Sequence, residues 1–557
     1  MRLSLVTLNA RYSHSCPALF HLRQALAAAL PQSRITIQQF TINDPYYDTL
    51  LAITETEPEA LCFSVSVWNV TQTLRLMADL RLVLPEIPMV VGGPEAASLG
   101  KGQLPPGCTV VQGEVEGLSP EFYADLAAGQ LAPEYRAAAG PAFGMPYRDE
   151  DFSTRLANRN IYYESSRGCP FACAYCLSSV ERGMRLVELA TVYADLAKIL
   201  AHRPRVVRFV DRTFNADPGR CLAIWQWLLA QSGETLFHFE IAPDLFSETM
   251  LDFLATVPPG RFQFEIGLQS TTPPVLAAVN RRMDLDRASA NISRLARLNT
   301  IHLHLDLILG LPMETEESFL ASLDHAFALA PHYLQMGLLK VLPDTPLAAR
   351  TQEFGLVHST LPPYSVLATG WLDHPTLRRL HRLGECVEAF HNNRFFRGLF
   401  GYLRRKGVAG SAFFAQLLAV CEAEGFFGLA ATQELMARML VRLGEALPDQ
   451  QLFGELLRFD WLASGQRQFP AFLGDNEALR QARDQLWQAL PESWPPYFDH
   501  AGRKEFCKRG VFFPFSAELL AVAGLGDGSR PGQVCFLPER DGGVMGRQRM
   551  AVFFQGE

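Results

Sequence analysis

The chain has 557 residues, too many for one ordinary hydrophobic core, so roughly two to four domains are expected. With 48% hydrophobic and 19% charged residues, it has the composition of a folded globular protein and not of a disordered one. The formal net charge of -8 argues against an extensive nucleic-acid-binding surface, although a local basic patch is compatible with it.

Membrane and secretory segments are not expected. No run of 18 uncharged apolar residues occurs, and the most apolar stretch, residues 412–432, is interrupted by Gln416, Glu422 and Glu424. That stretch therefore predicts a pair of buried helices. The first residues lead directly into a strand pattern without a signal-peptide cleavage region, and the cysteines show no secretory pairing. We therefore expect a cytoplasmic protein.

Residues 1–135 alternate between strand and helix patterns, which predicts a Rossmann-like, doubly wound parallel sheet. The expected strands are 3–8, 34–40, 60–67, 88–91 and 108–112, and the clearest helices are 17–30 and 71–84. Ligands of such sheets bind beyond the carboxyl ends of the strands. The candidate binding residues follow four of these strands: Asn9, Ser13, His14, Ser64, Ser66, Trp68, Gly92, Gly93, Gly113 and Glu114. No G-x-G-x-x-G opens the first helix, so a dinucleotide site is not indicated.

Residues 136–160 are rich in proline and alanine and are expected to be a linker. The alternation of strand and helix resumes after them. Strands are expected at 161–164, 206–210, 236–241, 262–268, 302–307 and 334–341, with helices at 186–202 and 218–231. This alternation predicts a second parallel α/β domain over residues 161–346, with its active residues at the carboxyl ends of the strands.

A cysteine-containing loop follows the first of these strands. Cys169, Cys173 and Cys176 have the spacing C-x3-C-x2-C, and Tyr175 precedes the last of them. A tetrahedral zinc site usually takes a fourth ligand from a second cysteine or histidine pair, and no other two of the 11 cysteines are close in sequence. Three thiolates on a four-iron cluster leave one iron open for reaction. Buried free thiols, or zinc with a distant fourth ligand, are the alternatives.

The cysteine spacing resembles that of the radical S-adenosylmethionine (SAM) superfamily. The resemblance implies a partial (β/α)6 barrel and a [4Fe-4S] cluster held by the three cysteines. It also implies that the amino and carboxylate groups of SAM chelate the open iron, and that an electron from the cluster cleaves SAM to a 5′-deoxyadenosyl radical. Such an enzyme needs an external one-electron donor of the flavodoxin or ferredoxin type.

Polar residues at later strand ends extend this resemblance. Glu240, Gln269, Arg281 and Asp306 lie at spacings similar to those in the oxygen-independent coproporphyrinogen oxidase branch, where the matching residues contact SAM. Asp211 follows the second strand, where many members have a Gly-Gly-Glu stretch that receives the SAM amino group, and it is assigned that role by analogy. Taken singly, Asp306 could form a strand-end turn, and Arg281 could pair with Asp284 or Asp286 at the surface.

The N-terminal part resembles a cobalamin-binding domain, because Ser64-Val65-Ser66 precedes Gly92-Gly93 at the spacing typical of that family. Small residues there would leave room for the nucleotide tail of cobalamin. Classical members carry Asp-x-His-x-x-Gly after the first strand, whereas this chain has Asn9-Ala10-Arg11-Tyr12-Ser13-His14. His14 is therefore either a neighbour of the lower corrin face or a loop histidine that caps the backbone. Trp68 is either a corrin contact or a buried core residue.

Residues 347–557 have helical periodicity and predict a mainly α-helical C-terminal domain. Pro363-Tyr364-Ser365-Val366-Leu367 and Trp371-Leu372 resemble an uncharacterised domain attached to some cobalamin-dependent radical SAM proteins. A basic cluster in this region could contact an anionic substrate, but a solvated helix face is the favoured interpretation. The cluster comprises Arg394, Arg397, Arg404, Arg405 and Lys406, with Phe395, Phe396 and Tyr402 between them.

Together these features predict an α/β cobalamin-dependent radical SAM enzyme that methylates an unactivated carbon of an unidentified substrate. Other outcomes remain open: a radical rearrangement or cyclisation, or a methylthiotransferase-like enzyme with a second cluster on Cys16, Cys62 and Cys108. The distribution of those three cysteines along the sheet makes the second cluster the weaker alternative. A non-catalytic cobalamin or iron–sulfur sensor is the alternative of another class.

Overall fold

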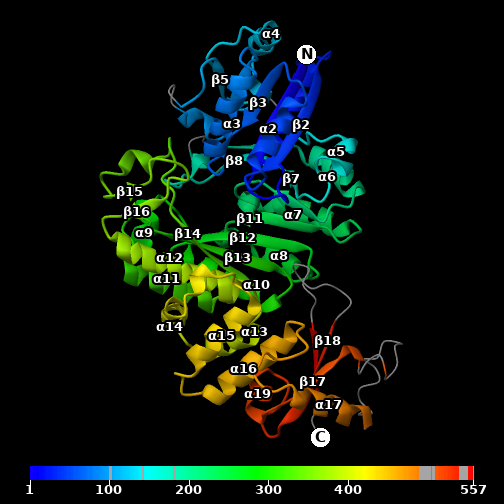
Figure 1. Cartoon of the computed structure of the whole chain (residues 1–557), viewed down its shortest axis with the longest axis vertical. Helices are drawn as coiled ribbons and strands as arrows, with labels where there is room; N and C mark the ends of the chain where they lie inside the picture. The colour runs from blue at the N-terminus through cyan, green and yellow to red at the C-terminus, as the bar shows by residue number, and fades with distance from the viewer. Residues whose placement is uncertain are drawn as a thin grey trace.

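The computed structural model describes residues 1–99, 103–140, 143–179, 183–488, 504, 508–538 and 550–555. Three parts follow one another from top to bottom of Figure 1: an N-terminal sheet, a central barrel and a C-terminal helical region. Within the described part of the chain, no helix is both long and apolar enough to cross a membrane.

The N-terminal part is an all-parallel sheet. Its strands are β1 (Arg2–Asn9), β2 (Arg34–Thr41), β3 (Ala60–Ser64), β4 (Met89–Gly92), β5 (Cys108–Gln112) and β6 (Glu134–Arg136), in the order β2-β1-β3-β4-β5-β6. Its helices are α1 (Pro17–Ala29), α2 (Tyr46–Thr54), α3 (Val70–Val83) and α4 (Pro120–Ala128). β3 is buried along its whole length, as expected for a central strand covered on both faces. The doubly wound sheet is confirmed, and β6 is an additional strand too short to show a period in the sequence.

The segment expected to be a linker, residues 136–160, is packed between the N-terminal sheet and the barrel. It contains α5 (Asp149–Ser153), and the fully buried Asp151 accepts hydrogen bonds from Arg23 of α1 at 2.7 and 2.6 Å. The buried Tyr147 donates to the backbone oxygen of Tyr162 at 2.7 Å. These contacts join the segment to both of its neighbours.

The central part is a six-stranded parallel sheet that curves into an open barrel, as predicted. It contains β7 (Ile161–Tyr163), β10 (Val206–Phe209), β11 (Leu236–Ile241), β12 (Phe262–Gln269), β13 (His302–Leu309) and β14 (Tyr333–Leu338), in the order β14-β13-β12-β11-β10-β7. The surrounding helices are α6 (Leu189–Ala201), α7 (Pro218–Ala230), α8 (Glu248–Leu254), α9 (Pro273–Ala278), α10 (Leu285–Leu298) and α11 (Glu316–Ala328). β7 and β14 are the edges of this sheet.

The two faces of the barrel sheet differ in polarity. The face toward the helices is built from buried aromatic and aliphatic residues such as Phe239 and Phe264, which lie against Trp225 of α7. The alternate residues on the concave face are polar. Parallel sheets are usually apolar on both faces, so this alternation marks the barrel interior as the functional face.

The cysteine loop is part of a hairpin that the sequence did not predict. β8 (Ser166–Cys169) pairs in antiparallel fashion with β9 (Gly183–Leu186). At Gly168 the backbone has φ +97°, and a Cβ atom would lie 2.1 Å from the backbone oxygen of Gly183. Only glycine fits this crossing, which places Cys169 at the end of β8.

The C-terminal part is mainly helical, as predicted. Its helices are α12 (His374–Cys386), a π-helix (Val387–Asn392), α13 (Arg397–Arg405), α14 (Gly410–Ala423), α15 (Gln433–Gly444), α16 (Gln450–Ala463), α17 (Glu477–Gln488) and α19 (Ala517–Val522). Two small antiparallel sheets were not expected: β15 (Val357–His358) with β16 (Val366–Ala368), and β17 (Val511–Phe515), β18 (Gly532–Pro538) and β19 (Met550–Gln555). The expected helix pair at 412–432 is one helix, α14, followed by a short 3-10 turn.

The basic cluster of the C-terminal part does not form one continuous surface. Arg404 lies over the ring of Phe327, 5.2 Å from its centroid, and is half-buried, whereas Arg397, Arg405 and Lys406 are exposed. The favoured interpretation, a solvated helix face, therefore holds for Arg397, Arg405 and Lys406 but not for Arg404.

Candidate active site at the open barrel

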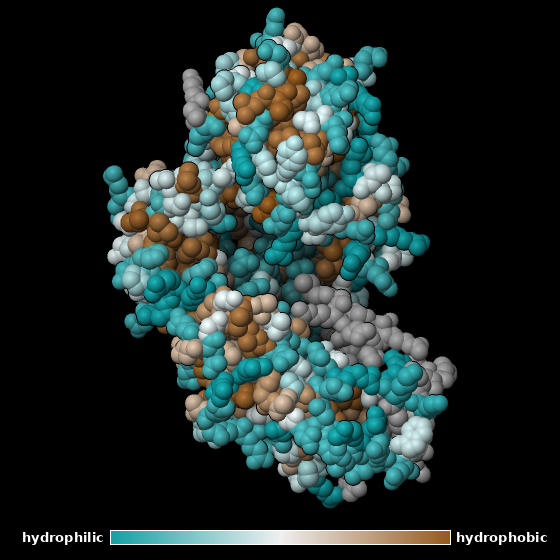
Figure 2. All heavy atoms as spheres, viewed as in Figure 1, coloured by the Kyte–Doolittle hydropathy of each residue, from teal (hydrophilic) through white to brown (hydrophobic). Residues whose placement is uncertain are grey.

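The cysteine loop is attached to the barrel by backbone contacts on two sides. The Asn280 side chain donates to the backbone oxygen of Ala172 at 2.8 Å, and the Ala174 amide donates to that of Val279 at 2.8 Å. The Leu347 amide donates to the backbone oxygen of Ala174 at 2.9 Å. The loop is therefore held at the mouth of the barrel by the segments after α9 and β14. In Figure 2 the surface is hollowed between the upper part of the molecule and the parts below it.

The three cysteines differ in exposure. Cys173 is buried and its Sγ accepts from Arg281 at 3.7 Å, whereas Cys169 and Cys176 are partly exposed, with Cys169 Sγ lying 3.5 Å from the hydroxyl of Thr213. No three Cys, His, Asp or Glu side chains of the described residues are gathered closely enough for a single metal ion. One zinc ion would need its sulfurs about 2.3 Å from a common centre. The cysteines of a four-iron cluster bind different iron atoms and need no such common centre.

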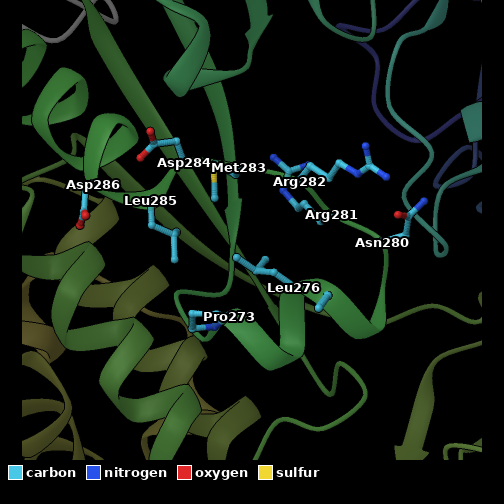
Figure 3. Close-up of a pocket in the computed structure, with 10 residues that line it drawn as sticks. Pro273, Leu276, Asn280, Arg281, Arg282, Met283, Asp284, Leu285 and Asp286 are labelled. Carbon is cyan, nitrogen blue, oxygen red and sulfur yellow. The ribbon is translucent and has the colours of Figure 1, made fainter.

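Two cavities adjoin this loop and share Asn280 and Arg282. One, of about 340 Å³, is lined by Cys169 and the residues after it, and the other, of about 700 Å³, is lined by residues 273–286. Figure 3 shows Arg281 and Arg282 side by side in the larger cavity, with Asp284 and Asp286 at its other end. Arg281 donates to Cys173 and to the backbone oxygen of Gly267, so the surface pairing with Asp284 or Asp286 does not occur.

The structure brings together the four residues expected to contact SAM. Glu240 is paired in register with Glu265, and Gly267 is paired with Asp306, so the side chains lie on neighbouring strands of the concave face. A bulge after Gly267 places Gln269 at φ +69°. Oε1 of Gln269 and Nε of Arg281 are buried without a hydrogen-bond partner. Unpartnered buried polar atoms are costly in a folded protein, and here they fit a polar ligand such as SAM.

The carboxyl groups of the concave face have very different proton affinities. Burial raises the pKa of Glu240 to about 7, and repulsion from Glu265 and Asp306 adds to this effect, while Arg212 opposes it. Burial also raises the pKa of Asp306, although His304, whose Nε2 lies 3.1 Å from Oδ1, opposes it. At Glu265 burial is outweighed by His238, His304 and Arg208, which lower its pKa to about 2. Glu265 is thus ionised at neutral pH, whereas the pKa of Glu240 lies close to neutral pH.

Asp211 has a different role from the one assigned by analogy. Its carboxylate accepts hydrogen bonds from the Ser165 amide at 3.0 Å and from the Ser165 and Ser166 hydroxyls at 2.6 Å. It is buried, and burial raises its pKa to about 6 despite these bonds. Both carboxylate oxygens of Asp211 are therefore engaged by Ser165 and Ser166, which fixes the start of the cysteine hairpin.

A band of polar side chains across the barrel floor was missed in the sequence. Nη2 of Arg208 lies 2.9 Å from Nε2 of His238 and 3.4 Å from Glu265, and His238 lies 3.2 Å from the same carboxylate oxygen. His304 continues the band on β13, and its ring lies 4.2 Å from that of Tyr333 on β14. The signal was present in the alternation of polar and apolar residues along β11, β12 and β13.

Several of the expected cobalamin residues line one cavity in the N-terminal part. Ser64, Gly92 and Gly93 meet there with apolar side chains of α1 and α4, including Leu19 and Phe122. At about 40 Å³ the cavity is smaller than a nucleotide, so side chains of α1 and α4 would have to move for the tail of cobalamin to enter. The residues present suit an apolar ring with few polar contacts.

The loop after β1 lies against the barrel. His14 Nδ1 is 2.8 Å from the Tyr162 hydroxyl, and Ser13 accepts a hydrogen bond from the Asn160 amide at 2.7 Å. Burial, followed by Arg208 and Arg11, lowers the pKa of His14. Asn9 is buried at the end of β1, and its side-chain amide lies 3.4 Å from that of Gln39. His14 therefore contacts the barrel and is not a histidine that only caps its own loop.

The loop after β3 holds Ser66 and Trp68 differently. The Ser66 amide donates to Asn69 at 2.7 Å inside the loop, and Ser66 is buried. Trp68 is 53% exposed, which excludes the core position that was one of its two interpretations. An exposed indole at the carboxyl edge of the sheet is available for contact with a ligand.

Glu114 is engaged in an ionic cluster and not in the cobalamin groove. It lies 2.8 Å from Arg167 of β8 and is paired with Arg185 of β9, and it accepts from the Gly140 amide at 2.8 Å. Gly113 has φ +90°, and a Cβ atom on it would lie 2.6 Å from the backbone oxygen of Ala137. Both residues therefore have structural roles at the junction with the cysteine hairpin.

A second cluster on Cys16, Cys62 and Cys108 is not supported. Cys16 follows β1 at the carboxyl edge of the sheet, whereas Cys108 begins β5 at the opposite edge. Cys62 is buried within β3. Their separation excludes a common centre in this arrangement of the strands.

Comparison with known families identifies two segments of the chain. Residues 163–326 match the Radical SAM superfamily, and residues 352–518 match a family described as a protein of unknown function, DUF4080.

Curated relatives match only part of the chain. It is 27% identical over 221 residues to ribosomal protein uS12 methylthiotransferase RimO of Syntrophotalea carbinolica, covering 37% of this chain and 48% of the relative. It is 25% identical over 342 residues to the cobalamin-dependent radical SAM methyltransferase TokK of Streptomyces tokunonensis, covering 54% of this chain and 50% of the relative. The chain thus matches about half the length of each.

Among solved structures, the chain resembles the cobalamin-dependent SAM radical enzyme OxsB, in a structure with aqua-cobalamin and SAM bound. The TM-score is 0.58 at 12% identity, and the likeness covers 82% of this chain and 80% of that one. At this identity the comparison supports a shared fold only. Because it covers 82% of the chain, the likeness extends beyond the barrel into the N- and C-terminal parts.

Proposed function

We propose that this chain, a radical SAM protein with the fold of cobalamin-dependent members, uses a [4Fe-4S] cluster, SAM and cobalamin to methylate an unactivated carbon. The observation that carries the proposal is the junction of the Cys169–Cys173–Cys176 loop with Glu240, Gln269, Arg281 and Asp306 at one barrel mouth. A structural cluster would need no such set of polar residues beside it, which disfavours the sensor alternative.

The chain's own residues would bind and orient SAM. The cluster, when bound, supplies the electron that cleaves SAM. Arg281 already contacts Cys173 and lies beside the cavity, so it can position the SAM carboxylate near the cysteine loop. Glu240, Gln269 and Asp306 can accept hydrogen bonds from the ribose hydroxyls. The apolar helical face of the sheet and the N-terminal part above it would limit the access of water.

The N-terminal part would hold cobalamin at the carboxyl edge of its sheet. Ser64, Gly92 and Gly93 line the cavity proposed for the nucleotide tail, and the exposed Trp68 is proposed to contact the corrin. For this division of roles we propose the domain limits 1–135, 161–346 and 347–557, with residues 136–160 as the connection between the first two. The electron donor would be a flavodoxin- or ferredoxin-type protein.

A methylthiotransferase is the rival within the same superfamily, because curated relatives with that activity match the chain. The rival requires thiolates for a second cluster in the N-terminal part, and the positions of Cys16 and Cys108 at opposite edges of the sheet disfavour it. A radical rearrangement uses the same cofactors and is separated from methylation only by its products.

The test uses anaerobically purified, iron-reconstituted protein supplied with hydroxocobalamin. After desalting, the absorption spectrum reports bound corrin, and after addition of SAM and dithionite the products are quantified. We expect retained corrin, 5′-deoxyadenosine from SAM cleavage and S-adenosylhomocysteine from methyl donation. Corrin with 5′-deoxyadenosine alone would indicate a radical rearrangement. A cluster without corrin would overturn the assignment of the N-terminal part.

The matched control compares cysteines inside and outside the loop. Cys173→Ser should lose most of the iron and all SAM cleavage, because one of three cluster ligands is removed. Cys108→Ser should keep both, because the half-buried Cys108 lies at the far edge of the N-terminal sheet.

A further inference from the structure

The free edge of the barrel sheet is covered by the segment that matches the family of unknown function. The side-chain amide of Asn392, in the π-helix, accepts from the Leu334 amide and donates to the Leu334 backbone oxygen, both at 2.9 Å. It thus pairs with edge strand β14 as a neighbouring strand would. An unpaired edge strand is otherwise open to association with other chains.

Beyond β14 the same edge is paired with the chain around β16. The Val366 amide donates to the Leu339 backbone oxygen and the Val341 amide to that of Tyr364, both at 2.9 Å. Glu388 of the π-helix accepts from the Tyr333 hydroxyl at 2.5 Å and from Asn392 at 2.7 Å. The C-terminal part therefore completes one side of the open barrel.

One residue of this edge extends to the N-terminal part. The Tyr364 hydroxyl donates to Glu95, whose side chain comes from the turn after Gly92-Gly93-Pro94. Glu95 is only 3% exposed, and its amide donates to the backbone oxygen of Val65 at 3.3 Å. The contact therefore holds the turn that follows the expected cobalamin glycines.

The backbone of Tyr364 supports a specific requirement for this contact. Tyr364 has φ +59°, in the left-handed region that bulky residues rarely adopt. Such strain persists where the surrounding structure over-determines it, and it is often found at functional positions. In this conformation the Tyr364 backbone pairs with Val341 while its side chain contacts Glu95.

We propose that residues 364–392 form a closing wall along one edge of the barrel, and that Tyr364 is a positioning residue which holds the Gly92–Glu95 turn in the shape that retains cobalamin. The segment seals the barrel edge through Asn392 and joins the cobalamin-binding part through Tyr364. The retention of cobalamin rests on the proposed function. The hydrogen bond between Tyr364 and Glu95 does not depend on it.

The first test compares Tyr364→Phe with Tyr402→Phe. Both substitutions remove a hydroxyl bonded to a carboxylate of the described structure, because Tyr402 donates to Asp449 at 3.1 Å within the C-terminal part. Hydroxocobalamin is loaded, and its release after dilution is followed by absorbance. We expect release about fivefold faster for Tyr364→Phe, the effect of one lost hydrogen bond, and unchanged release for Tyr402→Phe. Equal release from wild type and Tyr364→Phe would overturn the proposal.

A double-mutant cycle identifies the partner. Glu95→Ala should accelerate release as Tyr364→Phe does, Glu95→Gln should retain slow release because its amide oxygen still accepts, and the double variant Tyr364→Phe/Glu95→Ala should add nothing further. Additive effects would contradict a direct Tyr364–Glu95 role.

Hydrogen exchange separates this inference from the proposed function. If the wild type retains no corrin, the proposed function fails. The role of Tyr364 in holding the Gly92–Glu95 turn can still be tested, by hydrogen exchange of the cofactor-free protein. The amides of Ala96 and Ser98 donate within this turn, to the backbone oxygens of Gly93 and Glu95, and the Glu95 amide donates to that of Val65. They should exchange faster in Tyr364→Phe than in Tyr402→Phe, and unchanged protection would overturn the inference.

Discussion

At the scale of single residues, two glutamates on the concave face differ in pKa because their neighbours differ. Glu240 and Glu265 are register partners on adjacent strands, but Glu265 has His238 and Arg208 within 3.4 Å, whereas the half-buried Glu240 is repelled by two other acids. One is therefore a permanent anion, and the other exchanges its proton near neutral pH. If Glu240 contacts SAM as proposed, this difference makes SAM binding depend on pH.

We expect SAM to bind more tightly as pH rises through about 7, because ionised Glu240 is the better acceptor for ribose hydroxyls and attracts the SAM cation. If only the ionised form binds, affinity should increase roughly tenfold between pH 6 and pH 8. Equilibrium binding of SAM to the cluster-loaded protein measures this. Glu240→Gln should remove most of the dependence, and Glu234→Gln, at an exposed position, should leave it intact. The same pH slope in Glu240→Gln would show that another group is responsible.

At the scale of elements, the two glycines of the Gly92-Gly93 turn are there for different reasons, room for a ligand and a close backbone approach. The sequence pattern cannot tell these reasons apart. Gly92 lines the cavity, and a Cβ there would make only ordinary contacts of 3.5 Å or more. Gly93 has φ +111°, and its Cβ would lie 2.4 Å from the backbone oxygen of Val65. The second glycine is thus required by the crossing of β4 and β3 alone, whether or not a ligand binds.

Gly93→Ala should therefore destabilise the cofactor-free protein by more than about 2 kcal/mol, since both the backbone conformation and the contact with Val65 oppose a Cβ atom. Gly129→Ala is the control, because Gly129 also has positive φ, +68°, but its Cβ would meet nothing within 4 Å. That change should cost only about 1 kcal/mol. Urea unfolding of both variants measures the difference, and equal losses would refute the steric argument.

At the scale of the whole molecule, an ionic cluster joins the N-terminal part to the cysteine hairpin. Arg167 precedes Gly168-Cys169 and lies 2.8 Å from Glu114, 3.1 Å from Glu116 and 2.7 Å from Glu164, while its guanidinium lies over the Phe143 ring at 4.4 Å. The Arg167 side chain is 17% exposed and that of Glu114 is 12% exposed. These charges are mostly removed from water, so each depends on its partners.

Arg167→Met should destabilise the protein by about 2–4 kcal/mol and reduce the iron retained after reconstitution, because three carboxylates lose their shared cation beside the cysteine loop. Arg294→Met is the matched control: Arg294 also pairs with two acids, Glu248 and Asp252, but at an exposed site. Its loss should destabilise the protein far less than Arg167→Met, because water screens this exposed pair of contacts. Urea unfolding and iron analysis provide the measurements. Equal effects of the two substitutions would mean that the cluster does not position the hairpin.

The sequence could not supply these interdomain contacts, because they join residues far apart in the chain. Arg167 and Glu114 are assigned to different parts, and Tyr364 and Glu95 are separated by 269 positions. Asp211 shows the same limit at short range: its place after a strand predicted a ligand contact, but Ser165 and Ser166 occupy its carboxylate. The analogy could identify the position and not the direction of the side chain.

By itself, the sequence determined the local features: the cysteine spacing, the alternation of strands and helices, and the placing of Glu240, Gln269 and Asp306 on strands with Arg281 after one of them. These depend on residues near one another in the chain, where periodicity and turn chemistry act directly. Only the tertiary structure decided that Glu114 and Asp211 support the cysteine hairpin, that Trp68 is exposed, and that the C-terminal part covers the edge of β14. Side-chain direction, burial and partners depend on how distant segments pack, and no local pattern encodes that packing.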